Sequence, residues 1–380
     1  MKPFFTDKNR TVQRSVRAFC ERELKPIAGE IDQEGTFPWE VVEKMGKMGY
    51  FGIQVPRELD GAGMDTVNYV IVIEEISRAS GGIGLCVTVH NSVGVYPLVA
   101  FGTEEQKKRW VPPLAKGEKI GAFCITEPNA GSDASAIEAT ARRDGDHYVV
   151  NANKVFVTNG GVADTCLIFA RTDPAAGRKG ISVIVVERGT PGFVVGDLED
   201  LCSVRSNPVS SIRLYDCRVP VDNVLGGEGM GLRIGLAALD VGRIGIAAQA
   251  VGIFQAALEE SILYAGQRHQ FGVPIGRHQA VSMMLAEMAT QVDASRLMVF
   301  RAALLRDQGR PFSQASAMAK LFASEAASRV TDMAVQIHGG YGFSKAYPVE
   351  RYFRDARVTR VYEGTSEIHG IVIARGILGE

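Results

Sequence analysis

The spacing of apolar residues changes twice along the chain, and no other sequence feature constrains its fold as strongly. Residues 12–24 and 67–76 carry apolar side chains that recur mostly at three-, four- and five-residue steps, as on one face of a helix. From about residue 123, short apolar segments such as ISVIVVE are separated by Gly, Pro and Asp, as in strands joined by turns. The helical spacing returns after residue 230 and persists. The chain is therefore predicted to be helical, then β, then helical again.

This order predicts a mainly α protein with a middle β domain, an α+β fold in three parts. The predicted boundaries place an N-terminal α-helical domain at residues 1–121, a middle β domain at 122–230 and a C-terminal α-helical domain at 231–380. Long antiparallel helices are the natural packing for the last part. The dipeptide Asn159-Gly160 ends the segment YVVNANKVFVT and is typical of a hairpin turn.

Several common site types are not indicated. The β segments cluster instead of alternating with helices, and no G-x-G-x-x-G stands at a strand-to-helix turn, which argues against a Rossmann fold. Gly226–Gly231 is glycine-rich but misses that spacing, so it is interpreted as a flexible hinge. No G-x-S-x-G elbow is present, and the six histidines lack the spacing of zinc or iron ligands, so we expect no metal.

The charge balance excludes partners that need a strong electrostatic field. The 42 basic and 43 acidic residues nearly cancel, so neither nucleic acid nor an acidic membrane surface is expected as a partner. Apolar runs such as Ile181–Val186 are too short to span a bilayer. The start MKPFFTDKNR resembles neither a secretion signal nor a transit peptide, and the six cysteines form no C-x-x-C pair. We therefore expect a cytoplasmic protein with reduced thiols.

Three polar segments stand out as candidate ligand sites. FCITEPNAGSDA, at residues 123–134, ends in a loop whose backbone N–H groups and hydroxyls suit a polar ligand. VFVTNGG, at 155–161, also places a Thr just after apolar residues at a predicted strand end. VYEGTSEIHG, at 361–370, carries two glutamates four residues apart, which raises the question of paired-carboxylate catalysis.

These segments resemble, in order along the chain, the motifs of the acyl-CoA dehydrogenase flavoproteins. The other matching stretches are RSNPVSSIRLYDCRVP, RHQFGVPIGRHQA, AVQIHGGYGFS and FRDARV, so the resemblance covers essentially the whole sequence. It implies an N-terminal helical domain, a small β-barrel domain and a C-terminal four-helix bundle. It also implies FAD as the cofactor.

The resemblance implies a reaction in which Glu363 is the catalytic base. The family converts an acyl-CoA thioester to the trans-2-enoyl-CoA: a glutamate takes the α-proton while hydride passes from the β-carbon to N5 of FAD. A carboxylate suits this role because an apolar acyl chain excludes water and raises the proton affinity of the base. Gly364 leaves room for the thioester oxygen beside the backbone. Paired-carboxylate catalysis is therefore set aside, and Glu367 is interpreted as a contact to the cofactor.

The remaining site residues are carried over by motif. For FAD they are Phe123, Ile125, Thr126, Ser132, Phe156, Thr158, Arg268, Gln270, Phe271, Gln279, Gln336, Gly339, Gly340, Thr365 and Glu367. For the acyl-CoA substrate they are Ser132, Asp240, Arg243, Tyr362 and Gly364. Many relatives have Trp where this chain has Phe156, which keeps an aromatic face but no indole N–H. The segment around Arg268 resembles one that reaches the FAD of a neighbouring subunit, so a homotetramer is implied.

The resemblance leaves several alternatives open. Electron-transfer flavoprotein is the implied electron acceptor, while an oxygen-reactive oxidase variant and a non-catalytic binding protein of the same fold are the alternatives. Gly81, Gly82, Gly84 and Gly242 leave width for a short, branched or alicyclic acyl group in the degradation of fatty or other carboxylic acids. The segment His90–Pro97 contains no arginine, which disfavours a dicarboxylic substrate.

Overall fold

The computed structural model describes residues 5–379 and opens with a helical region. Threonines at positions 6 and 103 form capping boxes, and Asp65 and Ser80 cap the helices that begin at Thr66 and Gly81, so the sequence marks these four helix starts locally. The helices are α1 (Asp7–Phe19), α2 (Ala28–Glu34), α3 (Trp39–Lys47), α4 (Thr66–Ala79), α5 (Gly81–Val89), α6 (Tyr96–Phe101) and α7 (Glu104–Ala115), with π-helical turns at Cys20–Leu24 and His90–Val95.

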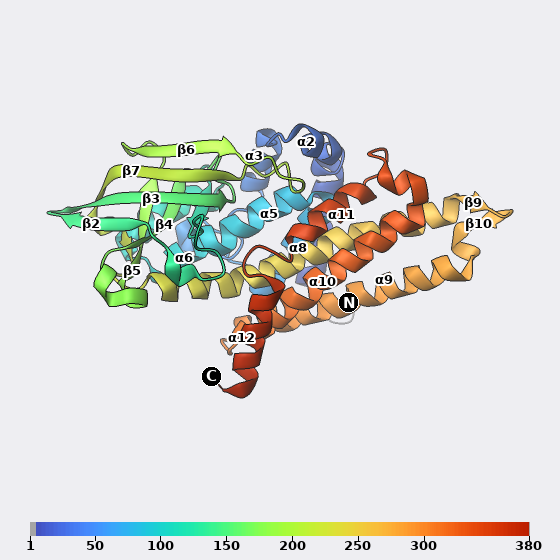
Figure 1. The fold of residues 1–380 in the computed structure, drawn as a ribbon. Helices are drawn as coiled ribbons and strands as arrows, with labels where there is room; N and C mark the ends of the chain where they lie inside the picture. The colour runs from blue at the N-terminus through green and yellow to red at the C-terminus, as the bar shows by residue number, and fades with distance from the viewer. Residues whose placement is uncertain (1–4, 380) are drawn as a thin grey trace.

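The middle region is one sheet of eight strands at one end of the molecule (Figure 1). Its strands are β1 (Gly121–Cys124), β2 (Thr140–Asp144), β3 (His147–Val157), β4 (Thr165–Arg171), β5 (Ile181–Glu187), β6 (Phe193–Leu198), β7 (Ser210–Pro220) and β8 (Val224–Leu225). The order is β6-β7-β3-β2-β4-β5-β8, and β1 pairs in parallel with β4. Within the described residues β6 and β8 do not pair with each other, so the expected closed barrel is wrong. The two-residue β8 leads almost directly into a helix, which leaves too little strand to close the sheet.

The turn at Asn159-Gly160 does not make the predicted hairpin. β3 pairs with β2 and β7, whereas β4 pairs with β1, β2 and β5. Asn159 does take the left-handed conformation expected at a turn, with φ 65°. Its buried amide donates to the carbonyls of Cys86 and Gly121, so the turn anchors the sheet to α5 instead of reversing a strand.

The described part of the C-terminal region contains five helices, of which the three longest run side by side (Figure 1). These are α8 (Gly231–Gln267), α9 (Gln279–Asp307), α10 (Ser313–His338), α11 (Val349–Val358) and α12 (Ser366–Leu378), with a short ribbon of β9 (His269–Gln270) and β10 (Val273–Pro274) at the far end. Short 3-10 turns occupy 57–59, 134–136, 174–180, 221–223, 275–277 and 339–343. The main core joins α4, α8, α9 and α10, and α12 projects from this body.

Two helical stretches correct the expectation about apolar length. Residues 81–101 and 231–267 are long and apolar enough, by length and composition, to cross a membrane. Their apolar windows are 83% and 78% buried inside the protein, as in core helices. The sequence estimate failed because glycines and isolated polar residues interrupt both apolar stretches. The cysteines agree with the predicted reduced thiols, since all six are free and only Cys202 is exposed.

Candidate active site

Glu363 lies in the short connection between α11 and α12, in an unusual backbone conformation. Its φ is 52° and that of Gly364 is 99°, so two consecutive residues are left-handed. A non-glycine residue in this region costs roughly 1–3 kcal/mol and persists only where its surroundings hold it. The following residue, Thr365, caps α12 by accepting from the N–H of Ile368 at 3.4 Å. The fold therefore fixes the direction in which the Glu363 side chain leaves the chain.

The Glu363 carboxylate is buried without a partner. Neither Oε1 nor Oε2 has a hydrogen-bond partner among the described residues. The side chain lies against Gly242 on α8, where an added Cβ would come within 2.1 Å of Oε2. Burial raises the pKa of the Glu363 carboxyl to about 8, although the nearby charges of Lys320 and Arg243 act in the opposite direction. A carboxylate in this environment has a high proton affinity, as a general base requires.

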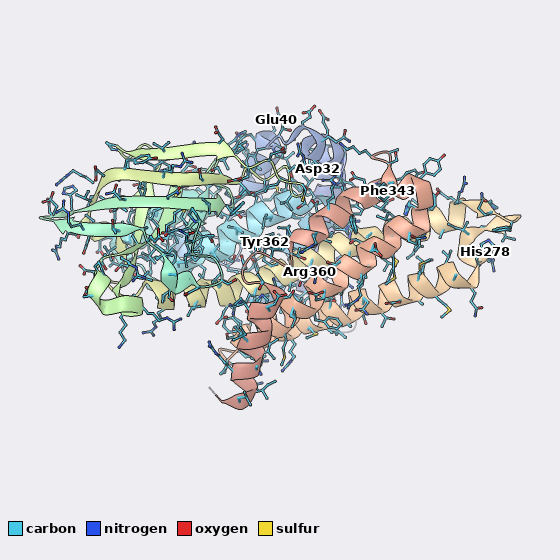
Figure 2. The ribbon with its side chains drawn as sticks, viewed as in Figure 1. Asp32, Glu40, His278, Phe343, Arg360 and Tyr362 are labelled. Atoms are coloured by element: carbon cyan, nitrogen blue, oxygen red, sulfur yellow. The ribbon has the colours of Figure 1, made fainter. Side chains whose placement is uncertain are left out.

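Four residues carried over as substrate contacts lie around this carboxylate. Asp240 and Arg243 form an ion pair at 2.7 Å on α8, and Arg243 is only 5% exposed. The Nε of Arg243 has no partner in the part of the chain that is described, so one donor stays available. Tyr362, which Figure 2 labels in the middle of the molecule, donates its hydroxyl hydrogen to Oε1 of Gln249 at 2.7 Å. Gly364 follows directly, so this part of the predicted site is gathered in one place.

The two segments predicted to bind the isoalloxazine also lie side by side. The N–H of Val155 donates to the carbonyl of Thr126 at 3.0 Å, which joins the end of β3 to the chain beyond β1. Phe156 is 61% exposed with φ 53°, and Phe123 packs edge-on against Phe169 at 4.7 Å. An exposed aromatic ring at a strand end suits the cover of a flat ligand. The other predicted residues of these segments lie in the same stretches and are at least partly exposed: Ile125, Ser132 and Thr158.

A buried ion pair that the sequence analysis missed supports these segments. Lys154 on β3 is fully buried and donates to Oε1 of Glu127 at 2.6 Å and to the carbonyl of Ile125 at 3.2 Å. The same carboxylate accepts from the N–H of Ala139 at 3.0 Å. Lys154 appeared in the sequence as one polar residue of an alternating strand, so nothing marked it as buried.

The residues predicted to bind the rest of the dinucleotide line a separate cavity. This cavity of about 620 Å³ is bounded by Arg268, Gln270, Gly339 and Gly340, together with Tyr264 and Tyr341. Apart from its own chain neighbours, no atom of the described residues comes within 4 Å of a Cβ built on either glycine, so both leave their backbone open. Phe271 beside it is 94% exposed, and Gln279 and Gln336 are exposed on α9 and α10. Arg268 offers a cation that suits a phosphate.

The cavity and the Glu363 carboxylate lie far apart in one chain. Arg268 follows Arg243 by about 25 residues at the end of the same helix, which corresponds to roughly 37 Å at 1.5 Å per residue. In Figure 2, Tyr362 lies in the middle of the molecule, whereas His278 lies at its far end, near the β9 and β10 ribbon. An extended FAD molecule is shorter than this distance. The two groups of predicted residues therefore cannot contact one and the same FAD within a single chain.

The remaining predicted contacts, Thr365 and Glu367, stand at the start of α12. Glu367 is exposed, and the backbone N–H at this helix start and the Thr365 hydroxyl lower its pKa. Its surroundings are thus the opposite of those of Glu363, four residues earlier. Burial raises the pKa of Glu363, whereas the pKa of Glu367 is lowered. The two glutamates therefore do not act as a pair of similar carboxylates.

The residues present fit a bound FAD in two half-sites. Phe156 exposes an aromatic face next to Thr126 and Thr158, and Arg268 faces the open backbone of Gly339 and Gly340. The first set suits a flat, polar-edged ring, and the second suits a pyrophosphate. Each set alone would hold only one end of the molecule.

The glycines expected to widen the acyl pocket have another role. A Cβ at Gly81, Gly82 or Gly84 would collide with the packed side chains of Asp355, Ser206 and Ser77, at 2.7, 2.3 and 2.1 Å. These glycines therefore allow α5 to pack closely, and they do not create space for a substrate. Gly242 alone of the four makes room at the site, and it does so for the Glu363 carboxylate.

Comparison with protein families gives three matches in chain order. They are the acyl-CoA dehydrogenase N-terminal domain over residues 6–118, the acyl-CoA dehydrogenase middle domain over 122–217 and the acyl-CoA dehydrogenase C-terminal domain over 229–378. Among curated proteins, a short-chain specific acyl-CoA dehydrogenase of Clostridium acetobutylicum is 46% identical over 369 residues, covering 97% of both chains.

Solved structures resemble the whole chain. Butyryl-CoA dehydrogenase from Megasphaera elsdenii aligns with a TM-score of 0.96 and 39% identity, covering 98% of this chain and 99% of the other. A chain from a structure described as the electron transferring flavoprotein of Acidaminococcus fermentans aligns with a TM-score of 0.98 and 42% identity, covering 99% of both. The likeness therefore extends over all three regions of the fold.

Proposed function

The chain belongs to the acyl-CoA dehydrogenase family, FAD-dependent oxidoreductases of acyl-CoA thioesters, and on this premise we propose that it dehydrogenates a short-chain acyl-CoA with Glu363 as base. The observation that carries the proposal is the buried Glu363 carboxylate, which has no partner among the described residues and lies against Gly242. A structural carboxylate in such a place would normally be paired. An unpaired one is suited to receive a proton.

The proposed reaction removes one proton and one hydride from adjacent carbons. Glu363 takes the α-proton. The electron pair of the broken C–H bond stays on the α-carbon and forms the new double bond as hydride leaves the β-carbon. When bound, FAD supplies the acceptor for that hydride. The thioester oxygen gains charge during proton removal, and the left-handed turn at Gly364 leaves backbone exposed to stabilise it. Arg243, which retains an unpaired Nε, adds positive charge near the base.

A short acyl chain is supported by the side chains next to the base along α8. Gly242 and Gly245 are three residues apart and lie on one face of the helix. Gly242 faces Glu363, whereas a Cβ at Gly245 would lie 2.2 Å from the hydroxyl oxygen of Tyr69 and 2.6 Å from Cγ2 of Thr88. Tyr69 is fully buried, so it forms a wall one turn beyond the base. The names of the short-chain specific relative and of the butyryl-CoA dehydrogenase also support a short acyl chain.

We propose further that FAD is shared between two chains of a homotetramer. The separation of the two half-sites supports this. Ile125 of the first segment lies against Gly235 near the start of α8, whereas Arg268 stands at the other end of that helix, so a neighbouring chain would bring the two half-sites to one FAD. Exposed apolar residues on the C-terminal helices supply a surface for such packing: Leu236, Ile262, Leu263, Met283, Leu297 and Leu304. Electron-transfer flavoprotein as the acceptor rests on the family and on the Acidaminococcus structure. The cytoplasmic location stays a prediction from the sequence.

The test is anaerobic reduction of the flavin by a series of straight-chain, branched and alicyclic acyl-CoA thioesters. We expect the fastest bleaching with butyryl-CoA and a loss of at least about a thousand-fold in Glu363→Gln, which keeps the shape but cannot accept the proton. Glu40→Gln, at an exposed glutamate on α3, is the control. Bleaching of Glu363→Gln at the wild-type rate would contradict the mechanism.

Two further measurements separate the alternatives. Rapid reoxidation of the reduced flavin by air would indicate an oxidase, and no bleaching by any thioester would indicate a binding protein. Tyr69→Leu, which shortens the wall, should move the preferred acyl chain to greater length, whereas Tyr69→Phe keeps the ring and should not. An unchanged preference in Tyr69→Leu would show that another side chain limits the pocket.

A further inference from the structure

A second charged side chain reaches the connection that carries the base. Lys320 lies on α10 and is fully buried. Its Nζ donates to the carbonyl of Gly364 at 2.6 Å. A lysine is seldom buried to this degree without a specific role for its ammonium group. Its contact is to the residue directly after the proposed base.

This contact leaves the base free. Among residues 5–379, no carboxylate oxygen lies within ion-pairing distance of the Lys320 amine, and the Glu363 oxygens have no hydrogen-bond partner. A direct bond from Lys320 to Glu363 would hold the carboxylate in its charged form and weaken it as a proton acceptor. A bond to the neighbouring carbonyl instead fixes the peptide and leaves both oxygens available.

The backbone at this point needs such support. Glu363 and Gly364 are both left-handed, at φ 52° and 99°, and a strained pair of this kind relaxes unless neighbouring groups hold it. The buried ring of His369 lies on the other side, where a Cβ on Gly364 would come within 3.2 Å of its Cε1. Gly364 is thus held between a packed ring and a charged donor.

We propose that Lys320 is a positioning residue for proton abstraction, which holds the Gly364 carbonyl and through it the direction of the Glu363 side chain. This inference rests on the proposed function. Lys320 also places a positive charge near the base. The charged and titratable groups that act on this pair from the surrounding elements are Arg243 on α8, Glu325 on α10, and Glu367 and His369 on α12. Burial lowers the pKa of His369 to about 3 and that of Lys320 to about 7, so His369 is neutral and Lys320 is charged only on the acidic side of neutrality.

The test compares Lys320→Met with Lys320→Arg by stopped-flow flavin reduction across neutral and alkaline pH. Methionine fills the space but has no donor or charge, and we expect a loss of roughly ten- to a hundred-fold in the reduction rate at neutral pH. The loss should be larger at neutral than at alkaline pH, because Lys320 is charged only below its lowered pKa of about 7 and its charge there favours ionisation of Glu363. Binding of a non-reducible thioester should change little, and arginine should restore part of the rate.

Thr331→Val is the matched control. Thr331 is also buried on α10 but donates only within its own helix, to the carbonyls of Ala327 and Ser328, so its loss should leave the pH profile unchanged. If Lys320→Met retains no flavin, Lys320→Gln, which keeps a donor without the charge, is measured in its place. A wild-type rate and profile in the variant measured would overturn the inference. So would an equal loss at every pH, which a general weakening of the fold produces.

The outcome is separable from that of the proposed function. Reduction of the wild-type flavin by acyl-CoA and its loss in Glu363→Gln test the reaction itself, with Lys320 intact. If those results hold while Lys320→Met keeps the wild-type reduction rate and pH profile, only the proposed role of Lys320 is wrong. If the wild-type flavin is not reduced, the proposed function is wrong.

Discussion

Two fully buried lysines, Lys154 in the β region and Lys320 on α10 beside the connection between α11 and α12, have opposite surroundings. Lys154 meets a carboxylate, Glu127, at 2.6 Å and also a carbonyl, so its charge is compensated. Among residues 5–379, Lys320 donates only to the carbonyl of Gly364, and the nearby carboxylate of Glu363 has no hydrogen-bond partner. Burial lowers the pKa of both amines, to about 7 for Lys320. The buried charge of Lys154 is thus compensated by a carboxylate, whereas Lys320 and Glu363 form no ion pair.

The difference indicates that Lys154 stabilises the fold, whereas Lys320 belongs to the proposed reactive site. Around Lys154 the polar groups bind one another, which stabilises the strand ends that carry Thr126 and Phe156. Around Lys320 a strained backbone and an unpaired carboxylate persist, each at a cost in folding free energy. Stability is expected to depend on the first lysine and proton transfer on the second. Substitutions in each region test that division.

The largest effect on stability is expected from Lys154→Met. Removal of the amine leaves Glu127 buried and uncompensated, which typically costs about 3–5 kcal/mol. Thermal unfolding and flavin content measure the change, and both should fall. The double variant Lys154→Met with Glu127→Leu should recover part of the loss, because no lone charge remains. A double variant less stable than Lys154→Met alone would contradict this account of the pair.

Gly242→Ala should disturb the catalytic connection next most strongly. The new methyl group would meet Oε2 of Glu363 at 2.1 Å and displace the base, so we expect roughly a hundred-fold slower flavin reduction. The control is Gly266→Ala on the same helix, where a Cβ meets nothing within 4 Å. That change should be neutral or should stabilise by about 0.5–1 kcal/mol. Equal rates in the two variants would show that Glu363 is not confined by α8.

The effect expected to be smallest within any one pH unit is a pH dependence of folding stability. The folded pKa of Glu363, about 8, lies above its ordinary value of 4.5, so the folded state holds a proton that the unfolded state has lost between these values. Stability contributed by Glu363 therefore falls as pH rises through that window, by up to about 1.4 kcal/mol per pH unit. Glu363→Gln removes this slope, so its stability relative to the wild type should increase with pH.

The measurement is denaturant unfolding of both proteins on the acidic side of neutrality. Lys320 acts with the opposite sign at higher pH, because its folded pKa of about 7 lies below the ordinary 10.5 and stability rises between these values. Other titrating groups, such as Asp355, cancel in the difference between the two proteins. A difference that is constant with pH would mean that the Glu363 pKa is not raised.

The order of helical and β regions was predictable because the spacing of apolar residues along the chain shows which face of each element is buried. The helix, β, helix order and the ion pair of Asp240 with Arg243, three residues apart on one helix, follow from local spacing. The open sheet and the role of Asn159 did not follow, since strand pairing depends on distant segments. Asn159-Gly160 has the chemistry of a hairpin turn, yet its amide binds α5 instead.

The site was predictable only in part, for a related reason. Glu363 was found through the motif around it, and its raised pKa depends on burial that no local pattern shows. Lys320 was missed because one lysine among small residues on a helix looks like a solvated charge. A feature that offered some signal was its apolar surroundings, ASAMAKLFASEAA, in which a charge is poorly placed.

The length of α8 has a consequence for how mutations combine. If FAD is shared as proposed, an Arg268 defect in one chain disables the base of its neighbour and leaves its own base competent. A chain with Glu363→Gln has the converse defect, since its own chemistry is lost while its cavity still serves another chain. Two separately inactive proteins, assembled together, would then regain part of the activity. At the level of inheritance, two gene copies with these two different defects would complement one another, whereas a copy with the Arg268 defect would also impair the product of a sound copy.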